Sequence, residues 1–139
     1  MFGKKTKPQK IFRLDELKPM IQSGKPVLID FMQVNCGPCR VMDGIVNELA
    51  HEYGESAHIV KVDVTKVDGA AQAFNVRSTP TFVLIGRAAK KQSRKSERRG
   101  KATPNGTSKV GARWRTTGLV KKDQLERVLE ANGASKSNA

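Results

Sequence analysis

Residues 27–39, with the sequence VLIDFMQVNCGPC, contain the most informative pattern in this chain. They begin with an almost continuous apolar run, Val27 to Met32, which is typical of a strand buried on both faces and is interrupted only by Asp30. Cys36 and Cys39 are the only cysteines, and two thiols at this spacing at the start of a helix lie close enough to form a disulfide. A single C-x-x-C motif after a strand, among alternating strands and helices, indicates a redox-active dithiol.

Two other interpretations of the cysteine pair are possible. A purely structural disulfide between Cys36 and Cys39 would close so short a loop that it would constrain little of the unfolded chain. A structural zinc ion needs four ligands, and the chain offers only the distant His51 and His58 besides the two cysteines. We therefore expect chemistry at the thiols themselves, with no metal and no other bound cofactor.

The hydrophobic pattern elsewhere predicts further strands and helices. Strands are expected at 11–13, 27–32, 58–64, 81–85 and 110–116. Helices are expected at 14–23, 37–53, 69–74 and 121–132. The alternation in the first half predicts parallel strands joined by helical crossovers. The last two strands have no helical pattern between them, which predicts an antiparallel hairpin.

Periodicity also predicts which residues of the two longest helices face the core. For the helix at 37–53 they are Val41, Ile45, Val46 and Leu49. For the helix at 121–132 they are Leu125, Val128 and Leu129. The expected class is α/β, with a mixed sheet flanked by helices.

The net charge of +13 is concentrated in one segment. Residues 87–118 carry eleven basic side chains and one acidic one, whereas residues 19–86 are slightly acidic. This distribution indicates either an anionic partner, such as nucleic acid, a ribosome, a membrane or an acidic protein, or simply a solvated loop. The segment between Arg87 and Arg113 has no aromatic residue, which argues against a site that stacks nucleotide bases.

The length of 139 residues suggests one domain. We expect this domain at 11–132, with a flexible basic tail at 1–10, a flexible basic insertion at 87–109 and a disordered tail at 133–139. No apolar run approaches the roughly 18 residues that a membrane-spanning helix needs. The basic N-terminus is not followed by an apolar segment, so we expect no secretory signal and a reducing, cytoplasmic location.

Residues 10–86 and 110–132 resemble the thioredoxin family. The Cys-Gly-Pro-Cys motif follows the second predicted strand, and Asp30 lies six positions before Cys36, where the family has a buried aspartate. Lys61 matches the lysine that neighbours this aspartate. The other matching positions are the Ser78-Thr79-Pro80-Thr81 turn and Gly118.

The resemblance implies a thioredoxin fold and roles for individual residues. Cys36 would be an exposed attacking thiol and Cys39 the buried resolving thiol. Asp30 would accept a proton from Cys39, and Lys61 would adjust the proton affinity of Asp30. Pro80 would follow a cis peptide bond and face the dithiol. The expected substrate-binding residues are Asn35, Gly37, Pro38, Thr79, Pro80 and Gly118.

Three positions depart from the family pattern. Asn35 and Met32 stand where tryptophans are common, so the rim of the substrate groove is expected to be more polar. Gly44 replaces a proline that kinks the active-site helix. The family also joins the last two strands by a tight turn, whereas residues 86–109 intervene here and are expected to leave the domain at the end opposite Cys36.

These observations predict a thioredoxin-like protein-disulfide reductase. The resemblance implies disulfide-containing protein substrates, reduction by a NADPH-dependent thioredoxin reductase, and a monomer. The alternative is a binding module of the same fold whose basic insertion at 87–109 docks on an anionic partner.

Overall fold

The computed structural model describes residues 6–87 and 110–137. Within them, five strands form one sheet in the order β1-β3-β2-β4-β5. The strands are β1 (Gln9–Lys10), β2 (Val27–Met32), β3 (His58–Asp63), β4 (Thr81–Arg87) and β5 (Val110–Thr117). The helices are η1 (Leu14–Glu16), α1 (Leu17–Gln22), α2 (Gly37–Tyr53), α3 (Ala70–Ala73) and α5 (Lys122–Ala131).

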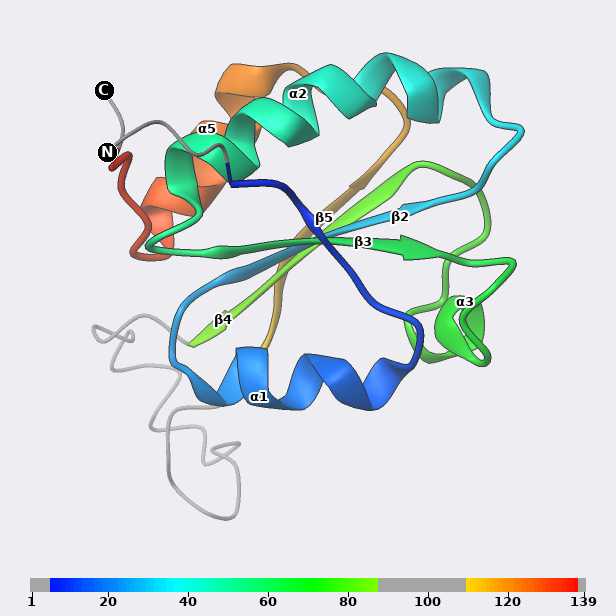
Figure 1. The fold of residues 1–139 in the computed structure, drawn as a ribbon, viewed down its shortest axis with the longest axis horizontal. Helices are drawn as coiled ribbons and strands as arrows, with labels where there is room; N and C mark the ends of the chain where they lie inside the picture. Colours follow the sequence, from blue (N-terminus) through cyan, green and yellow to red (C-terminus); the bar gives the residue numbers. More distant parts are fainter. Residues whose placement is uncertain (1–5, 88–109, 138–139) are drawn as a thin grey trace, which may run out of the picture.

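The sheet is mixed, as the sequence predicted. Strand β3 pairs in parallel with both β1 and β2, whereas β4 is antiparallel to β2 and β5 is antiparallel to β4. Helices α2 and α5 cover one face of the sheet, and α1 and α3 lie on the other (Figure 1). This arrangement is a thioredoxin fold whose final strands form the expected antiparallel pair.

The central strand β2 is buried on both faces. Leu28 belongs to the cluster of apolar side chains that contains the inner faces of α2 and α5. Ile29 and Phe31 belong to the cluster on the α1 and α3 face. Because side chains alternate along a strand, Asp30 shares the face of Leu28 and points toward α2. The sheet thus places the Asp30 carboxyl group between β2 and α2, the helix that begins with the two cysteines.

The core-facing side of α2 differs from the predicted one. Val41 is 64% exposed, so its assignment to the inner face is wrong. The buried positions are Cys39, Met42, Val46, Leu49, Ala50 and Tyr53. Each residue turns a helix by about 100°, so Val41, two positions after the buried Cys39, points almost directly outward. The position of Cys39 therefore fixes the rotation of the helix.

The N-terminal elements also differ from the predicted ones. The edge strand is Gln9–Lys10 rather than 11–13, so part of the expected flexible tail is paired with β3. The chain turns at Phe12 and Arg13 because the Glu16 carboxylate accepts hydrogen bonds from both of their backbone N–H groups, at 2.8 and 3.0 Å. The expected helix at 14–23 is divided into η1 and α1, and Pro19 occupies the first turn of α1, where an N–H has no helical partner.

The C-terminal segment packs against the domain as far as the structure describes it. The Ser135 N–H donates to the Ser56 hydroxyl at 2.8 Å, and the Ser137 N–H donates to the Glu52 carbonyl at 2.9 Å. Ala134 is buried. The prediction of a disordered tail from residue 133 is therefore wrong for residues 133–137. The predicted basic insertion, from residue 88 onward, lies outside the described residues.

Among residues 6–87 and 110–137, no helix combines the length and the apolar character that crossing a lipid bilayer requires.

Candidate active site

The two cysteines lie at the N-terminus of α2 and form a disulfide. Their Cα atoms are 5.2 Å apart, within the normal range for a disulfide. Cys36 is the N-cap residue, and its sulfur accepts a hydrogen bond from the Cys39 N–H at 3.1 Å. Pro38 lies in the first turn, where its missing N–H costs no helical hydrogen bond. The first turn of α2 therefore presents the Cys39 N–H and the positive end of the helix dipole to the Cys36 sulfur.

Cys36 is less exposed than expected. Its exposed fraction is 7%, against 3% for Cys39. Gly37 and Pro38, in contrast, are exposed. In this disulfide form Cys36 is thus buried, and its exposed neighbours in the chain are Asn35, Gly37 and Pro38.

The segment before β4 faces the disulfide. The Thr79–Pro80 peptide bond is cis, as the resemblance implied. The Thr79 hydroxyl donates a hydrogen bond to the Cys36 sulfur at 3.4 Å, and the Thr79 carbonyl oxygen lies 3.6 Å from the same sulfur. Contacts from a distant part of the sequence thus converge on Cys36.

Gly118 borders the same region from the end of β5. Its N–H donates to the Pro80 carbonyl oxygen at 2.8 Å. Its φ of +93° lies in the left-handed region, which explains the glycine at this position. Leu119, the next residue, is 62% exposed. Together with Val34, which is 54% exposed and precedes Asn35, it adds apolar surface to a rim that we expected to be polar.

Asp30 is the buried carboxyl group beneath this site. Only 2% of the residue is exposed, and neither carboxyl oxygen has a hydrogen-bond partner among the described residues. Burial raises the pKa of Asp30 to about 7, with the charge of Lys61 lowering it and that of Asp43 raising it. A carboxyl group with a pKa near 7 can both release and accept a proton at neutral pH.

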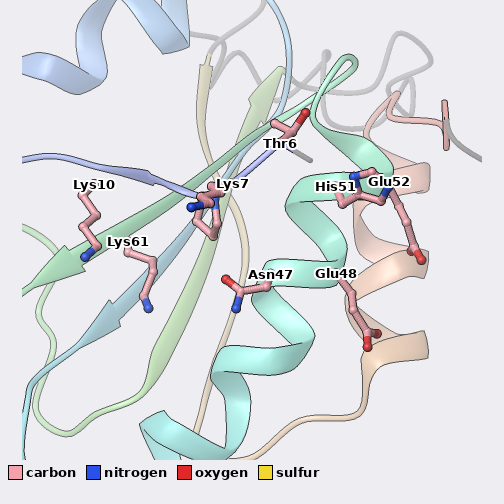
Figure 2. A pocket seen from close by; sticks show the side chains of 9 residues that line it. Thr6, Lys7, Lys10, Asn47, Glu48, His51, Glu52 and Lys61 are labelled. Atoms are coloured by element: carbon pink, nitrogen blue, oxygen red, sulfur yellow. The ribbon is translucent and has the colours of Figure 1, made fainter. Parts of the chain in front are cut away.

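Lys61 is the register partner of Asp30 on β3, but its ammonium group binds elsewhere. The Lys61 Nζ atom donates to Oδ1 of Asp43, on α2, at 2.9 Å. Lys61 also lines a cavity of about 480 Å³ between the N-terminal segment, β3 and α2, which Asn47 lines from the helix side (Figure 2). Lys61 is therefore close enough to act electrostatically on Asp30 while its hydrogen bond goes to Asp43.

Asp43 is the one residue of this group that the sequence analysis missed. It lies four positions after Cys39, so both residues lie on the same side of α2. The sequence shows an acidic residue at this spacing after Cys39. Its pairing with Lys61 depends on how α2 packs against β3, which the sequence pattern does not reveal.

The described residues contain no group of three or more His, Cys, Asp or Glu side chains placed to hold a metal ion. Cys36 and Cys39 are joined to each other.

Comparisons with known protein families and with curated relatives all identify thioredoxins. The thioredoxin family model matches residues 10–105. Among curated relatives, thioredoxin-1 of Drosophila melanogaster is 39% identical over 61 residues, which are 44% of this chain and 57% of the relative. Thioredoxin-2 of Pyricularia oryzae is 42% identical over 70 residues, or 50% of this chain and 40% of the relative. The match thus spans about half the length of the curated relatives.

Solved structures give the same fold. A mutant thioredoxin from Halobacterium salinarum superposes with a TM-score of 0.67 at 24% identity, covering 95% of this chain and 96% of that one. A thioredoxin from Schistosoma mansoni gives a TM-score of 0.65 at 24% identity, with coverages of 93% and 98%. The family model, the relatives and the disulfide at the start of α2 agree, and the chain belongs to the thioredoxin family.

Proposed function

We propose that this protein is a thiol–disulfide oxidoreductase that reduces disulfides in other proteins through Cys36 and Cys39. The observation that carries the proposal is the disulfide at the N-terminus of α2, held beside the cis Thr79–Pro80 segment. A structural cross-link has no need of a helix N-terminus, a facing hydroxyl donor and a nearby buried carboxyl group. A redox-active pair uses all three.

The first step is attack on the substrate by Cys36. In the reduced protein the N–H groups at the start of α2 stabilise a Cys36 thiolate. The thiolate attacks one sulfur of the substrate disulfide, the substrate S–S bond breaks, and a mixed disulfide with Cys36 forms. The other substrate sulfur leaves as a thiolate and takes a proton from water. We propose that an extended substrate segment passes along the backbone of Thr79 and Gly118, because Thr79 contacts Cys36 and Gly118 is bonded to the neighbouring Pro80.

The second step releases the substrate. The Cys39 thiol loses its proton to the Asp30 carboxylate, directly or through water. The Cys39 thiolate attacks the Cys36 sulfur, the mixed disulfide breaks, and the second substrate sulfur leaves as a thiolate. The substrate gains two electrons, and the protein is left with the Cys36–Cys39 disulfide that the structure contains. Asp30 suits this role because its pKa near 7 lets it cycle between both protonation states.

The remaining parts of the proposal follow from family membership. Thioredoxins are reduced by thioredoxin reductase, and we propose such an enzyme as the electron donor here. We also propose a monomer in the cytoplasm. The binding-module alternative depends on residues 88–109, which lie outside the described residues, so no observation favours it as a second function.

Reduction of insulin by dithiothreitol tests the proposal. The wild-type protein should accelerate precipitation of the insulin chains, and Cys36→Ser should not. Glu48→Gln is the matched control, because Glu48 lies on the outer side of α2, bound to Lys122 at 2.8 Å. Wild-type activity that survives in Cys36→Ser would overturn the mechanism.

The reduction potential of the Cys36–Cys39 pair tests the direction of the reaction. A reductant should have a potential near −270 mV, approximately the known value for thioredoxins. A potential near −120 mV, approximately that of the oxidant DsbA, would contradict the assignment as a reductase.

A further inference from the structure

The ion pair between Lys61 and Asp43 has a consequence for Asp30. Lys61 and Asp30 are direct register partners on neighbouring parallel strands, so the lysine is the cation best placed to pair with the buried carboxylate. The Lys61 side chain is only 14% exposed and its Nζ atom binds Asp43 at 2.9 Å, whereas the Asp30 oxygens have no hydrogen-bond partner among the described residues. The two carboxylates thus compete for one ammonium group, and Asp43 holds it.

Within residues 6–87 and 110–137, the groups that strand register and helix packing place around Asp30 come from β3, β4, α2 and α5. Strand β3 contributes Lys61, and β4 contributes the uncharged Phe82 as the other register partner. Helix α2 contributes Asp43 and Cys39, and the fully buried side chains of α5 are leucines. Lys61 is therefore the cation that acts on Asp30, and Asp43 is the anion that acts on it.

We propose that Asp43 is a positioning residue that holds the Lys61 ammonium group on the α2 surface and so leaves Asp30 without a direct counter-ion. The inference deepens the proposed function, on which its catalytic meaning rests. An Asp30 carboxyl group paired with Lys61 would remain ionised to lower pH and would be a weaker base for Cys39. Asp43 thus keeps Asp30 a strong enough base to accept the Cys39 proton near neutral pH.

The ion pair between Asp43 and Lys61 can be removed without disturbing the core. The Asp43 side chain is 40% exposed, so Asp43→Asn leaves no buried cavity and removes one charge. Glu48→Gln removes the same charge from the same helix and also breaks an ion pair with a lysine, but that lysine is Lys122 on α5. Asp43→Ala is a second variant, in case the asparagine amide retains a hydrogen bond to Lys61.

The experiment is a titration of the Asp30 side-chain carboxyl carbon by NMR in the oxidised full-length protein. We expect Asp43→Asn and Asp43→Ala to lower the Asp30 titration midpoint by on the order of one pH unit, because Lys61 is released toward Asp30 and a like charge is lost. Glu48→Gln should leave the midpoint unchanged. In a Lys61→Met background, Asp43→Asn should produce a clearly smaller change, since only the direct repulsion between carboxylates is left to remove.

Two results would overturn the proposal. One is an Asp30 midpoint that Asp43→Asn and Asp43→Ala leave where it is or move no further than Glu48→Gln does. The other is a change of equal size with and without Lys61, which would mean that Asp43 acts by direct repulsion alone. The titration needs no substrate and no turnover, so its outcome is independent of insulin reduction: an inactive wild-type protein would refute the proposed function and leave the titration result standing.

A kinetic measurement connects the titration to catalysis. The pH at which the resolving step reaches half its maximal rate, followed by stopped-flow release of substrate, should fall in Asp43→Asn together with the Asp30 midpoint. An unchanged pH profile alongside a lowered midpoint would contradict the role of Asp30 as the proton acceptor.

Discussion

The burial of Asp30 predicts that this residue makes the protein less stable as the pH rises. The pKa of Asp30 is about 7 in the folded protein, against an ordinary value of 3.8. Between these values the folded protein retains a proton that the unfolded chain has lost, so the free energy of unfolding falls as the pH rises from about 4 to about 7. Each pH unit between the two pKa values is worth about 1.4 kcal/mol, which gives a total of about 4 kcal/mol.

Asp30→Asn should remove this dependence, because an amide has nearly the same shape and does not ionise. The free energy of unfolding of the variant minus that of the wild type should increase by about 2–3 kcal/mol between pH 5 and pH 8.5, the part of the total that falls in this interval. Urea unfolding of the oxidised proteins, followed by the fluorescence of Trp114, measures both values. Trp114 is the only tryptophan, and it packs against the cluster beneath α2 and α5.

The matched control is Asp68→Asn, which removes a carboxylate from an exposed position. Its difference from the wild type should stay constant over the same pH interval. The reasoning would be refuted if the difference between Asp30→Asn and wild type were the same at pH 5 and pH 8.5, or if it decreased with pH. Either result would mean that Asp30 is not forced into its neutral form by burial.

Three further predictions concern stability. Gly44→Ala should raise the free energy of unfolding by about 1 kcal/mol in urea, since Gly44 is exposed inside α2 and an added Cβ meets no atom within 4 Å; a lower midpoint would show that the glycine is needed. Tyr53→Phe should cost about 1–3 kcal/mol, because the hydroxyl of the buried Tyr53 donates to Glu130 at 2.5 Å, and an unchanged stability would exclude that bond. Lys122→Met should lower the unfolding midpoint by an amount that shrinks in high salt, because its ammonium group binds Glu48 at 2.8 Å; a salt-independent loss would point to packing instead.

The sequence predicted the elements that carry the site almost to the residue. β2 and α2 have the predicted bounds, because the apolar run and the Cys-Gly-Pro-Cys helix start are strong local signals. The antiparallel pairing of β4 and β5 also followed from the sequence, which has no helical pattern between the two strands. The bounds of β2 and α2 depend on residues near each other in the chain.

The features that the sequence did not predict depend on packing between distant segments. Val41 points outward because Cys39 fixes the rotation of α2 against the sheet. The C-terminal residues are ordered by hydrogen bonds to Ser56 and Glu52, a partner surface that periodicity does not reveal. Asp43 binds Lys61 across the space between helix and strand, and one-dimensional patterns contain no information on that distance.

The most direct test of the account is to trap the mixed disulfide. Cys39→Ser retains the attacking thiol and lacks the resolving one, so it should form a stable covalent adduct with a disulfide-containing substrate, joined through Cys36 and visible by mass spectrometry. Cys36→Ser should form little or none, because Cys39 is the less exposed of the two residues, at 3% against 7%, and does not occupy the N-cap position at which the helix dipole stabilises a thiolate. An adduct of equal yield through Cys39 in Cys36→Ser, or no adduct in Cys39→Ser, would contradict the assignment of Cys36 as the attacking residue.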